Sequence, residues 1–312
     1  MSSLAWTLAG FGIAPSPVLA EHPTRILWDL RYSDSAGSAG LCDLYTPTYD
    51  GDQIDVNVDD AVPIRVTGAR RPAVVMVHGG GWITGDKWVQ ADYAKMLSEM
   101  GICVLNINYR LAPKNVFPAM VDDVRSALLF VQEHADALSV DRERIGLCGY
   151  SAGAHLSSLV AVMADEPMET RLLSSNWEAD DERWRSMPSI HGVCAGGTPS
   201  DFRSWPPANR TMAYFLGGSR EEVPDNYLGA SITAHVSKDD APMHLIHGET
   251  DFIVPYASGQ NLLDALRQAG VSAQMTKIEG EGHMVTFRHP ETIEAIRTFF
   301  QTRFLDRADT EP

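Results

Sequence analysis

The sequence predicts an α/β fold with a mostly parallel central sheet, helices on both faces and a small cap. Apolar, β-branched runs of strand length alternate with helical stretches, which is the pattern of parallel sheets covered on both faces. The 312 residues suffice for one large domain with a substantial core. We therefore expect a single domain over 1–312, with cap insertions near 165–188 and 199–232 and a cap helix at 1–20.

The individual elements follow from local patterns. The apolar runs that predict strands are, in chain order, 73–77, 102–107, 144–148, 241–247 and 272–278. A helix is expected over 121–134, where apolar residues recur at helical spacing, and another over 154–163. Residues 50–67 are acidic, and apolar side chains alternate in each half, so we expect an inserted hairpin there.

A G-x-S-x-G pentapeptide, Gly149-Tyr150-Ser151-Ala152-Gly153, joins the strand 144–148 to the helix 154–163. A serine on a tight strand-to-helix turn is pushed out of both elements, so its Oγ is exposed and strained. The flanking glycines are needed because a Cβ would clash at such a turn. The pattern predicts that Ser151 is the nucleophile of a serine hydrolase.

Three glycines end the strand 73–77, in the run His78-Gly79-Gly80-Gly81-Trp82. Their unhindered N–H groups can stabilise a tetrahedral oxyanion, and one such donor is typically worth about 3–4 kcal/mol. A phosphate-binding loop is the alternative, but it would require a following Lys-Ser/Thr, which residues 85–88 lack. We therefore expect an oxyanion loop.

A serine nucleophile needs an imidazole base, and the base needs a carboxylate that fixes its tautomer. Two acids, Glu249 and Asp251, follow the strand 241–247, at the strand end where open α/β sheets place their sites. After the last predicted strand, His283 lies on a glycine-flanked loop and is well placed to reach Ser151. His289, which precedes a proline at a helix start, is the rival base.

These motifs resemble the α/β-hydrolase superfamily, and within it the esterases with an HGGG oxyanion motif, which are hormone-sensitive-lipase-like or feruloyl- and acetyl-xylan-esterase-like. The resemblance extends from about Leu41 to Phe304. The matching blocks occur in the family's order and are HGGGWITGDK at 78–87, NYRLAP at 108–113, FPAMVDDV at 117–124, the segment 144–153, HGETD at 247–251 and GEGH at 280–283.

The resemblance implies a catalytic triad of Ser151, Asp251 and His283. It also implies that the N–H groups of Gly80 and Gly81 bind the oxyanion, while the general geometry of the nucleophile turn adds the N–H of Ala152. Candidate substrate-pocket residues adjoin the catalytic loops or lie in the cap insertions. They are Trp82, Tyr150, Phe202, Trp205, Phe215 and Val254. Aromatic residues in the insertions could instead fasten the cap to the body, as could Trp177 and Trp184.

The expected function is a serine carboxylesterase that hydrolyses short-chain esters through an acyl-enzyme on Ser151, with no cofactor. An arylformamidase or amidase could use the same triad, although its relatives tend to replace the third glycine, which is retained here as Gly81. A non-catalytic binding protein on this fold is the other alternative, although such proteins usually lose a triad member. The expected partner is a small-molecule ester, and the oligomeric state stays open.

Other sequence features restrict partners and cofactors. The net charge of −16 argues against nucleic acid and anionic membranes as partners. No apolar run reaches the roughly 18 residues of a membrane helix. Because no H-x-x-x-H or H-E-x-x-H spacing occurs, no metal site is expected. The cysteines lack paired spacing and are expected to be buried free thiols; they are Cys42, Cys103, Cys148 and Cys194.

The remaining histidines and an ion pair are expected to be structural. We expect His155 to be a packing or surface group, His244 and His247 to be buried and hydrogen-bonded, and His78 to support the oxyanion loop. Residues 109–110 and 122–123 are expected to form an ion-pair or hydrogen-bond scaffold beside that loop.

The amino terminus suggests a location in the cell. Residues 4–15 are apolar, but no lysine or arginine precedes them, as a secretory signal would require. We therefore expect a cytoplasmic protein, with a secreted form that carries an N-terminal signal as the alternative.

Overall fold

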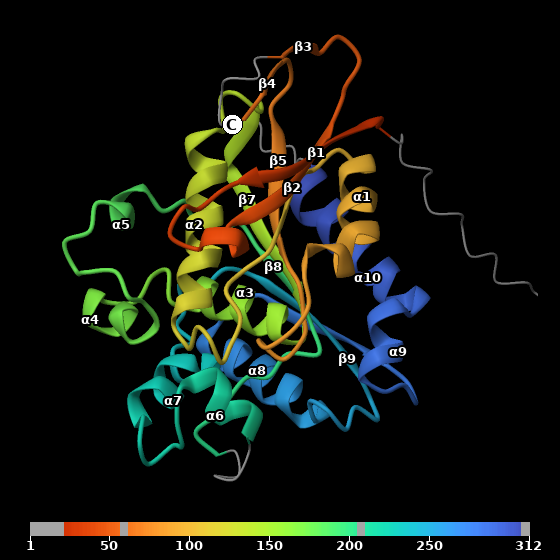
Figure 1. Cartoon of the computed structure of the whole chain (residues 1–312). Coiled ribbons are helices and arrows are strands. Elements are labelled where there is room, and N and C mark those ends of the chain that lie inside the picture. Colours follow the sequence, from red (N-terminus) through yellow and green to blue (C-terminus); the bar gives the residue numbers. More distant parts are fainter. Residues whose placement is uncertain (1–21, 57–61, 205–209, 307–312) are drawn as a thin grey trace, which may run out of the picture.

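The computed structural model describes residues 22–56, 62–204 and 210–306. Eight strands form one sheet in the order β1-β2-β6-β5-β7-β8-β9-β10 (Figure 1). β2 runs antiparallel to both neighbours, while the strands from β6 to β10 in that order are parallel. The predicted mostly parallel sheet is therefore confirmed. The strands are β1 Thr24–Arg31, β2 Leu41–Pro47, β5 Arg71–Val77, β6 Cys103–Ile107, β7 Val140–Tyr150, β8 Val193–Gly196, β9 Met243–Gly248 and β10 Ala273–Ile278.

The five predicted strands correspond to β5, β6, β7, β9 and β10. The sequence patterns did not single out β1, β2 or β8; β8 holds only four residues, too few for a clear apolar run. Because the central strands are parallel, the loops that follow β5, β7, β8 and β9 all leave the sheet at the same edge. That edge brings together segments far apart in sequence.

Helices cover both faces of the sheet (Figure 1). On one face α1 and α10 enclose one buried apolar cluster, and on the other face α2, α3 and α8 enclose a larger one. Every residue of α3 is buried. The helices are α1 Ala91–Glu99, α2 Ala119–Glu133, α3 Ala152–Val162, α4 Met168–Arg171, α5 Arg183–Ser186, α6 Arg210–Leu216, α7 Pro224–Ala230, α8 Tyr256–Ala269, α9 His283–Arg288 and α10 Pro290–Phe300.

The expected hairpin is present as β3 Gln53–Val56 paired antiparallel with β4 Ile64–Thr67. Its base is held to the body by the fully buried Arg71, whose Nη2 lies 3.0 Å from Oδ2 of Asp52. The hairpin tip at 57–61, the expected cap helix at 1–20 and the candidate pocket residue Trp205 lie outside the described residues.

The segment 165–188 packs against the side of α2. Trp177 and Trp184 are buried against each other at a ring-centroid distance of 4.9 Å and contact Leu129 of α2. Of the two roles considered for these tryptophans, the structure supports fastening the segment to the body.

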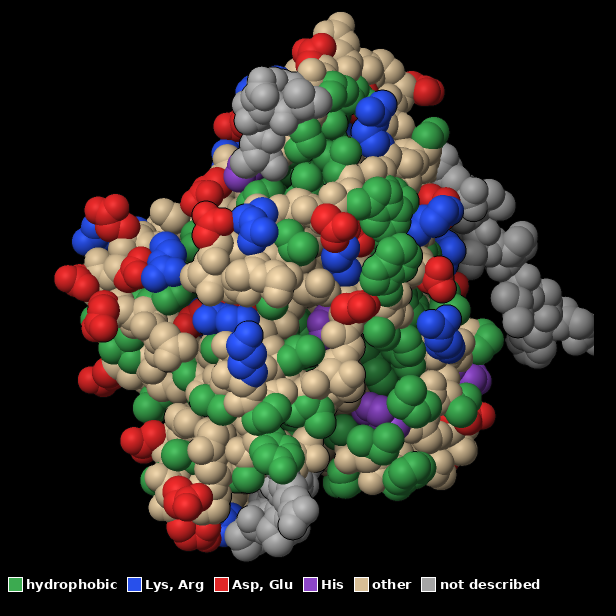
Figure 2. Space-filling view, in the orientation of Figure 1, with side chains coloured by type: hydrophobic (Ala, Val, Ile, Leu, Met, Phe, Trp, Pro, Cys, Tyr) green, Lys and Arg blue, Asp and Glu red, His purple; other side chains and the backbone are tan. Residues whose placement is uncertain are grey.

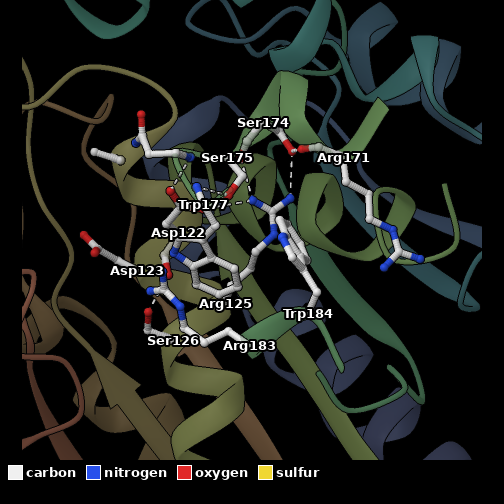
Figure 3. Close-up of polar contacts among 12 residues, drawn as sticks. Asp122, Asp123, Arg125, Ser126, Arg171, Ser174, Ser175, Trp177, Arg183 and Trp184 are labelled. Carbon is white, nitrogen blue, oxygen red and sulfur yellow. Dashed lines mark hydrogen bonds and ion pairs between the residues drawn. The ribbon is translucent and has the colours of Figure 1, made fainter. Parts of the chain in front are cut away.

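A buried polar network reinforces this attachment (Figure 3). Arg125 of α2 donates to the carbonyl of Ser174 at 2.5 Å and to its Oγ at 2.7 Å, and it pairs with Asp122 at 3.2 Å. Asp122 in turn accepts from the hydroxyl of Ser175 at 2.6 Å. Burial lowers the pKa of Arg125 to about 10, so its guanidinium remains charged at neutral pH.

A further buried carboxyl, that of Asp240, lies just before β9, at the amino ends of the parallel strands and opposite the site. Asp240 is only 6 % exposed. Burial raises its pKa to about 7; the N–H of Ser237, 2.9 Å from Oδ2, opposes the rise, and the charges of Asp165 and Glu166 add to it.

Candidate active site

Ser151 occupies a strained turn between β7 and α3. Its backbone lies at φ 56°, ψ −120°, a region that residues other than glycine rarely adopt. The neighbouring glycines are required by close packing: a Cβ on Gly153 would lie 1.9 Å from the carbonyl oxygen of Val77, and one on Gly149 would lie 2.4 Å from the backbone of Gly153. The turn holds Ser151 at the carboxyl end of the central strand.

His283 and Asp251 form a buried hydrogen-bonded pair. Nδ1 of His283 lies 2.6 Å from Oδ2 of Asp251, and the side chains are 5 % and 0 % exposed. Asp251 also accepts from the N–H groups of Ile253 at 2.9 Å and Val254 at 2.8 Å. Burial favours the neutral carboxyl, but the hydrogen bond from His283, the Val254 N–H and the nearby imidazoles outweigh it. The pKa of Asp251 is therefore lowered.

The turn after β8 brings this pair beside Ser151. The N–H of Ser151 donates to the carbonyl of Gly196 at 2.7 Å. A Cβ on the next residue, Gly197, would lie 2.8 Å from Cε1 of His283. Tyr150 adds a second tie, because its hydroxyl donates to the carbonyl of His283 at 2.6 Å. Glycine at 197 thus leaves the space that the imidazole fills.

Glu249 and His289, the alternatives to Asp251 and His283, have other partners. Glu249 pairs with Lys277 at 3.0 Å and accepts from the N–H of Gly280 at 3.0 Å. His289 caps the start of α10 by accepting from the N–H of Glu291 at 3.3 Å. The structure therefore joins Asp251 to His283 and directs both rivals elsewhere.

The glycine loop after β5 lies against the nucleophile turn. A Cβ on Gly79 would approach the Cβ of Ser151 to 3.3 Å. Gly80 and Gly81 have φ values of 123° and 60°, which favour glycine. No described residue accepts a hydrogen bond from the N–H of Gly80, Gly81 or Ala152. These three donors are thus available to a ligand beside Ser151.

A buried lysine anchors this loop, and the sequence reasoning did not single it out. Nζ of Lys87 donates to Asp43 and, at 2.7 Å, to Asp29. Its N–H donates to Oδ1 of Asn108 at 2.8 Å, and its carbonyl accepts from Asn106 at 2.7 Å. The available signal was the position of Lys87 at the end of the block HGGGWITGDK, which carries the family resemblance.

The expected scaffold beside the loop is confirmed for Tyr109, Arg110 and Asp123, whereas Asp122 pairs with Arg125 and Ser175 instead. The ring of His78 stacks on Tyr109 at 4.2 Å, and its Nδ1 donates to the carbonyl of Gly79 at 2.7 Å. Burial lowers the pKa of His78 to about 4, so the ring is neutral at pH 7. Arg110 pairs with Asp123, its Nε 2.9 Å from Oδ1.

Three candidate pocket residues form a closed aromatic cluster with His155. We define the aromatic cluster as Trp82, His155, Phe202 and Phe215, all of which are at most 2 % exposed. Trp82 stacks on Phe215 at 4.2 Å, and its Nε1 donates to Nδ1 of His155 at 3.2 Å. The rings therefore pack on one another and leave little of their surface exposed, and their assignment to the substrate pocket stays a prediction. His155 is the packing group that was expected.

The other two described candidates position the triad. Tyr150 holds the backbone of His283, as described above, and Val254 donates its N–H to Asp251. The carbonyl of Val254 accepts from Nε2 of His247 at 2.9 Å, and Nε2 of His244 lies 2.8 Å from the hydroxyl of Thr276. His244 and His247 are thus buried and hydrogen-bonded, as predicted.

The four cysteines are free and buried, as expected. Among residues 22–56, 62–204 and 210–306, no three histidine, cysteine or acidic side chains are grouped to hold a metal ion. Within the same ranges, no helix has both the length and the apolar character needed to cross a membrane.

The chain is similar in sequence to known esterases. The sequence profile of the BD-FAE family matches residues 61–266, and that of the TAP-like proteins matches 228–312. The chain is 32% identical over 204 residues to the probable carboxylic ester hydrolase LipM of Mycobacterium tuberculosis, covering 63% of this chain and 45% of that protein. It is 31% identical over 216 residues to the esterase LipQ of the same organism, covering 67% and 49%.

The chain thus spans about half the length of the curated relatives it matches. A solved structure described as a truncated carbohydrate esterase from gut microbiota superposes with a TM-score of 0.72 at 20% identity, over 92% of this chain and 98% of that one. Its likeness shows the α/β-hydrolase fold. Because the BD-FAE profile matches about two thirds of the sequence, the chain belongs to the BD-FAE family of α/β-hydrolases.

Proposed function

We propose that this protein is a serine carboxylesterase that hydrolyses short-chain carboxylic esters through an acyl-enzyme on Ser151. The observation that carries the proposal is the strained Ser151 beside the 2.6 Å pair of His283 and Asp251, with unpaired N–H donors in the adjacent glycine loop and at the start of α3. The names of the similar proteins, a probable carboxylic ester hydrolase and an esterase, support the same reaction class.

The first half of the reaction forms the acyl-enzyme. Because Nδ1 of His283 donates to Asp251, Nε2 carries the free lone pair. Nε2 removes the proton from Oγ of Ser151 as Oγ attacks the ester carbonyl. The N–H groups of Gly80, Gly81 and Ala152 hold the oxyanion. Nε2 then protonates the leaving alcohol, and the C–O bond to the alcohol breaks.

The second half releases the acid. His283 removes a proton from water, which attacks the acyl carbon, and Ser151 leaves with that proton. Asp251 stabilises the imidazolium in both halves. Its lowered pKa keeps it ionised at neutral pH. Burial lowers the pKa of the neighbouring His247, so that ring stays neutral and does not compete for the charge.

The test is a pair of serine variants assayed on a substrate panel. Ser151→Ala is expected to remove nearly all turnover of p-nitrophenyl acetate, while Ser157→Ala, at a buried position of the helix that follows Ser151, retains it. An organophosphate should modify one peptide, the one that contains Ser151. Unimpaired turnover in Ser151→Ala, or an adduct elsewhere, would refute the mechanism. Preference for aryl formamides over esters would favour an arylformamidase, and no turnover of either class would favour a binding protein.

A further inference from the structure

Large apolar side chains stand exposed directly beside two triad residues. Phe252 and Ile253 follow Asp251, and their exposed fractions are 86 % and 47 %. Met284 and Val285 follow His283 and are 70 % and 54 % exposed. We call these four residues the apolar rim. Residues of this kind are normally buried, and exposed groups of them at a site mark contacts with a ligand or partner.

The rim is held in place by the backbone of the catalytic loops. The N–H of Ile253 donates to Asp251, and the N–H of Thr250 donates to the carbonyl of Glu281 at 3.0 Å, which ties the two segments together. Met284 and Val285 lie in the first turn of α9. In Figure 2 hydrophobic side chains gather over the lower part of the molecule, where Figure 1 places α9 and the end of β9.

The position of the rim identifies the part of a substrate that it can touch. In the proposed mechanism, Nε2 of His283 gives its proton to the leaving oxygen, so the alcohol moiety emerges beside this histidine. The first residues beyond it are the exposed Met284 and Val285, and Phe252 follows its hydrogen-bonded partner Asp251. An apolar alcohol group that departs from the acyl carbon bonded to Ser151 therefore leaves on the side of these apolar side chains.

The side chains of the aromatic cluster, on the oxyanion side of Ser151, offer little surface to the substrate. The aromatic cluster beside the oxyanion loop is at most 2 % exposed, because its rings are packed on one another. Ile83 and Tyr214, the sequence neighbours of Trp82 and Phe215, are also exposed, at 40 % and 51 %, whereas the apolar rim directly follows His283 and Asp251. We propose that the apolar rim binds the apolar alcohol moiety of the substrate, an inference that rests on the proposed esterase function. Esters of small acids with long alkyl or aryl alcohols are then the preferred substrates.

The expected size of this preference follows from the area covered. A fully buried methylene contributes about 0.8 kcal/mol, which is about fourfold in kcat/KM. The rim covers one side of a chain, so we expect about twofold for each methylene added to the alcohol. Five methylenes would then give a preference on the order of 30-fold.

The decisive test compares two isomers, hexyl acetate and methyl heptanoate. They have the same formula and similar overall hydrophobicity, but the chain lies on the alcohol in one and on the acid in the other. We expect wild-type kcat/KM to favour hexyl acetate by at least about tenfold. In Phe252→Ser combined with Met284→Gln, this ratio should fall toward one through a higher KM for hexyl acetate. Val56→Ser, an equally apolar residue that is 60 % exposed on the remote hairpin, should leave the ratio unchanged.

The outcomes separate this proposal from the proposed function. If wild type hydrolyses neither isomer nor p-nitrophenyl acetate, the esterase function is refuted. The rim proposal is overturned if both isomers react but methyl heptanoate is preferred. It is also overturned if the ratio of the two kcat/KM values is unchanged in the double variant. Binding of Ser151→Ala to phosphatidylcholine vesicles that the double variant abolishes would reassign the rim to a membrane. A dimer in gel filtration that the double variant dissociates would reassign it to a second copy of the chain.

Discussion

Replacing Lys87 by methionine should destabilise the protein through an unpaired buried charge. Lys87 is 4 % exposed and Asp43 is 1 % exposed, so both charges are removed from water. Asp43 would keep only the N–H of Asp29, at 3.0 Å, as a described donor. The carboxylate of Asp29 is 66 % exposed and can turn to solvent, so it adds little to the loss. Removing one partner of a buried pair typically costs about 3–5 kcal/mol.

The magnitude can be expressed as a melting temperature. Unfolding carries an entropy of about 2.1 cal/mol/K per residue, or about 0.65 kcal/mol/K for 312 residues. The loss therefore corresponds to a fall in Tm of about 5–8 °C. Because the backbone bonds from Lys87 to Asn106 and Asn108 remain, kcat should fall by less than the roughly 10²-fold caused by losing an oxyanion donor.

Thermal unfolding followed by circular dichroism measures the effect, with two comparisons. Lys95→Met breaks the exposed pair with Glu99 and should cost less than about 1 kcal/mol. Adding Asp43→Asn to Lys87→Met removes the unpaired carboxylate charge and keeps an acceptor for the Asp29 N–H. The double variant should therefore recover part of the lost Tm. The reasoning fails if Lys87→Met melts no lower than Lys95→Met, or if the double variant melts no higher than Lys87→Met.

Three further predictions concern the base, a pH effect and the acyl chain. His283→Ala should abolish nearly all ester turnover while His289→Ala has little effect; the reverse order would show that the wrong base was chosen. The raised pKa of Asp240 favours its protonated form in the fold, so the contribution of this group to stability is fully present below about pH 4 and is lost as pH rises through about 7. Asp240→Asn should therefore raise Tm at pH 8, by up to about 6 °C, and change it little at pH 4. The exposed neighbour Asp239→Asn is the control, and an equal gain at both pH values would contradict the argument. Among p-nitrophenyl esters, kcat/KM should peak between acetate and hexanoate, because the aromatic cluster is closed; a steady climb to palmitate, or a jump on emulsification, would contradict this.

Local sequence was enough to predict the strands that precede the three triad residues. Runs of apolar β-branched residues identify the central strands, since strands of a parallel sheet are buried on both faces. The turn around Ser151 was predictable because only glycine tolerates the close packing seen at Gly149 and Gly153. The order of the candidate triad along the chain also follows from sequence, because each member ends a predicted strand or lies in the loop after it.

Tertiary structure decided which residues act together and which are merely packed. Glu249 and Asp251 are two residues apart, and only folding shows that Asp251 lies 2.6 Å from His283 while Glu249 pairs with Lys277. Hydrogen bonds of this kind join residues about thirty positions apart, and no local pattern records them. Whether an aromatic residue such as Trp82 lines a pocket or closes a cluster depends on which rings surround it. The sequence determines the side chain, but its burial is a property of the assembled fold.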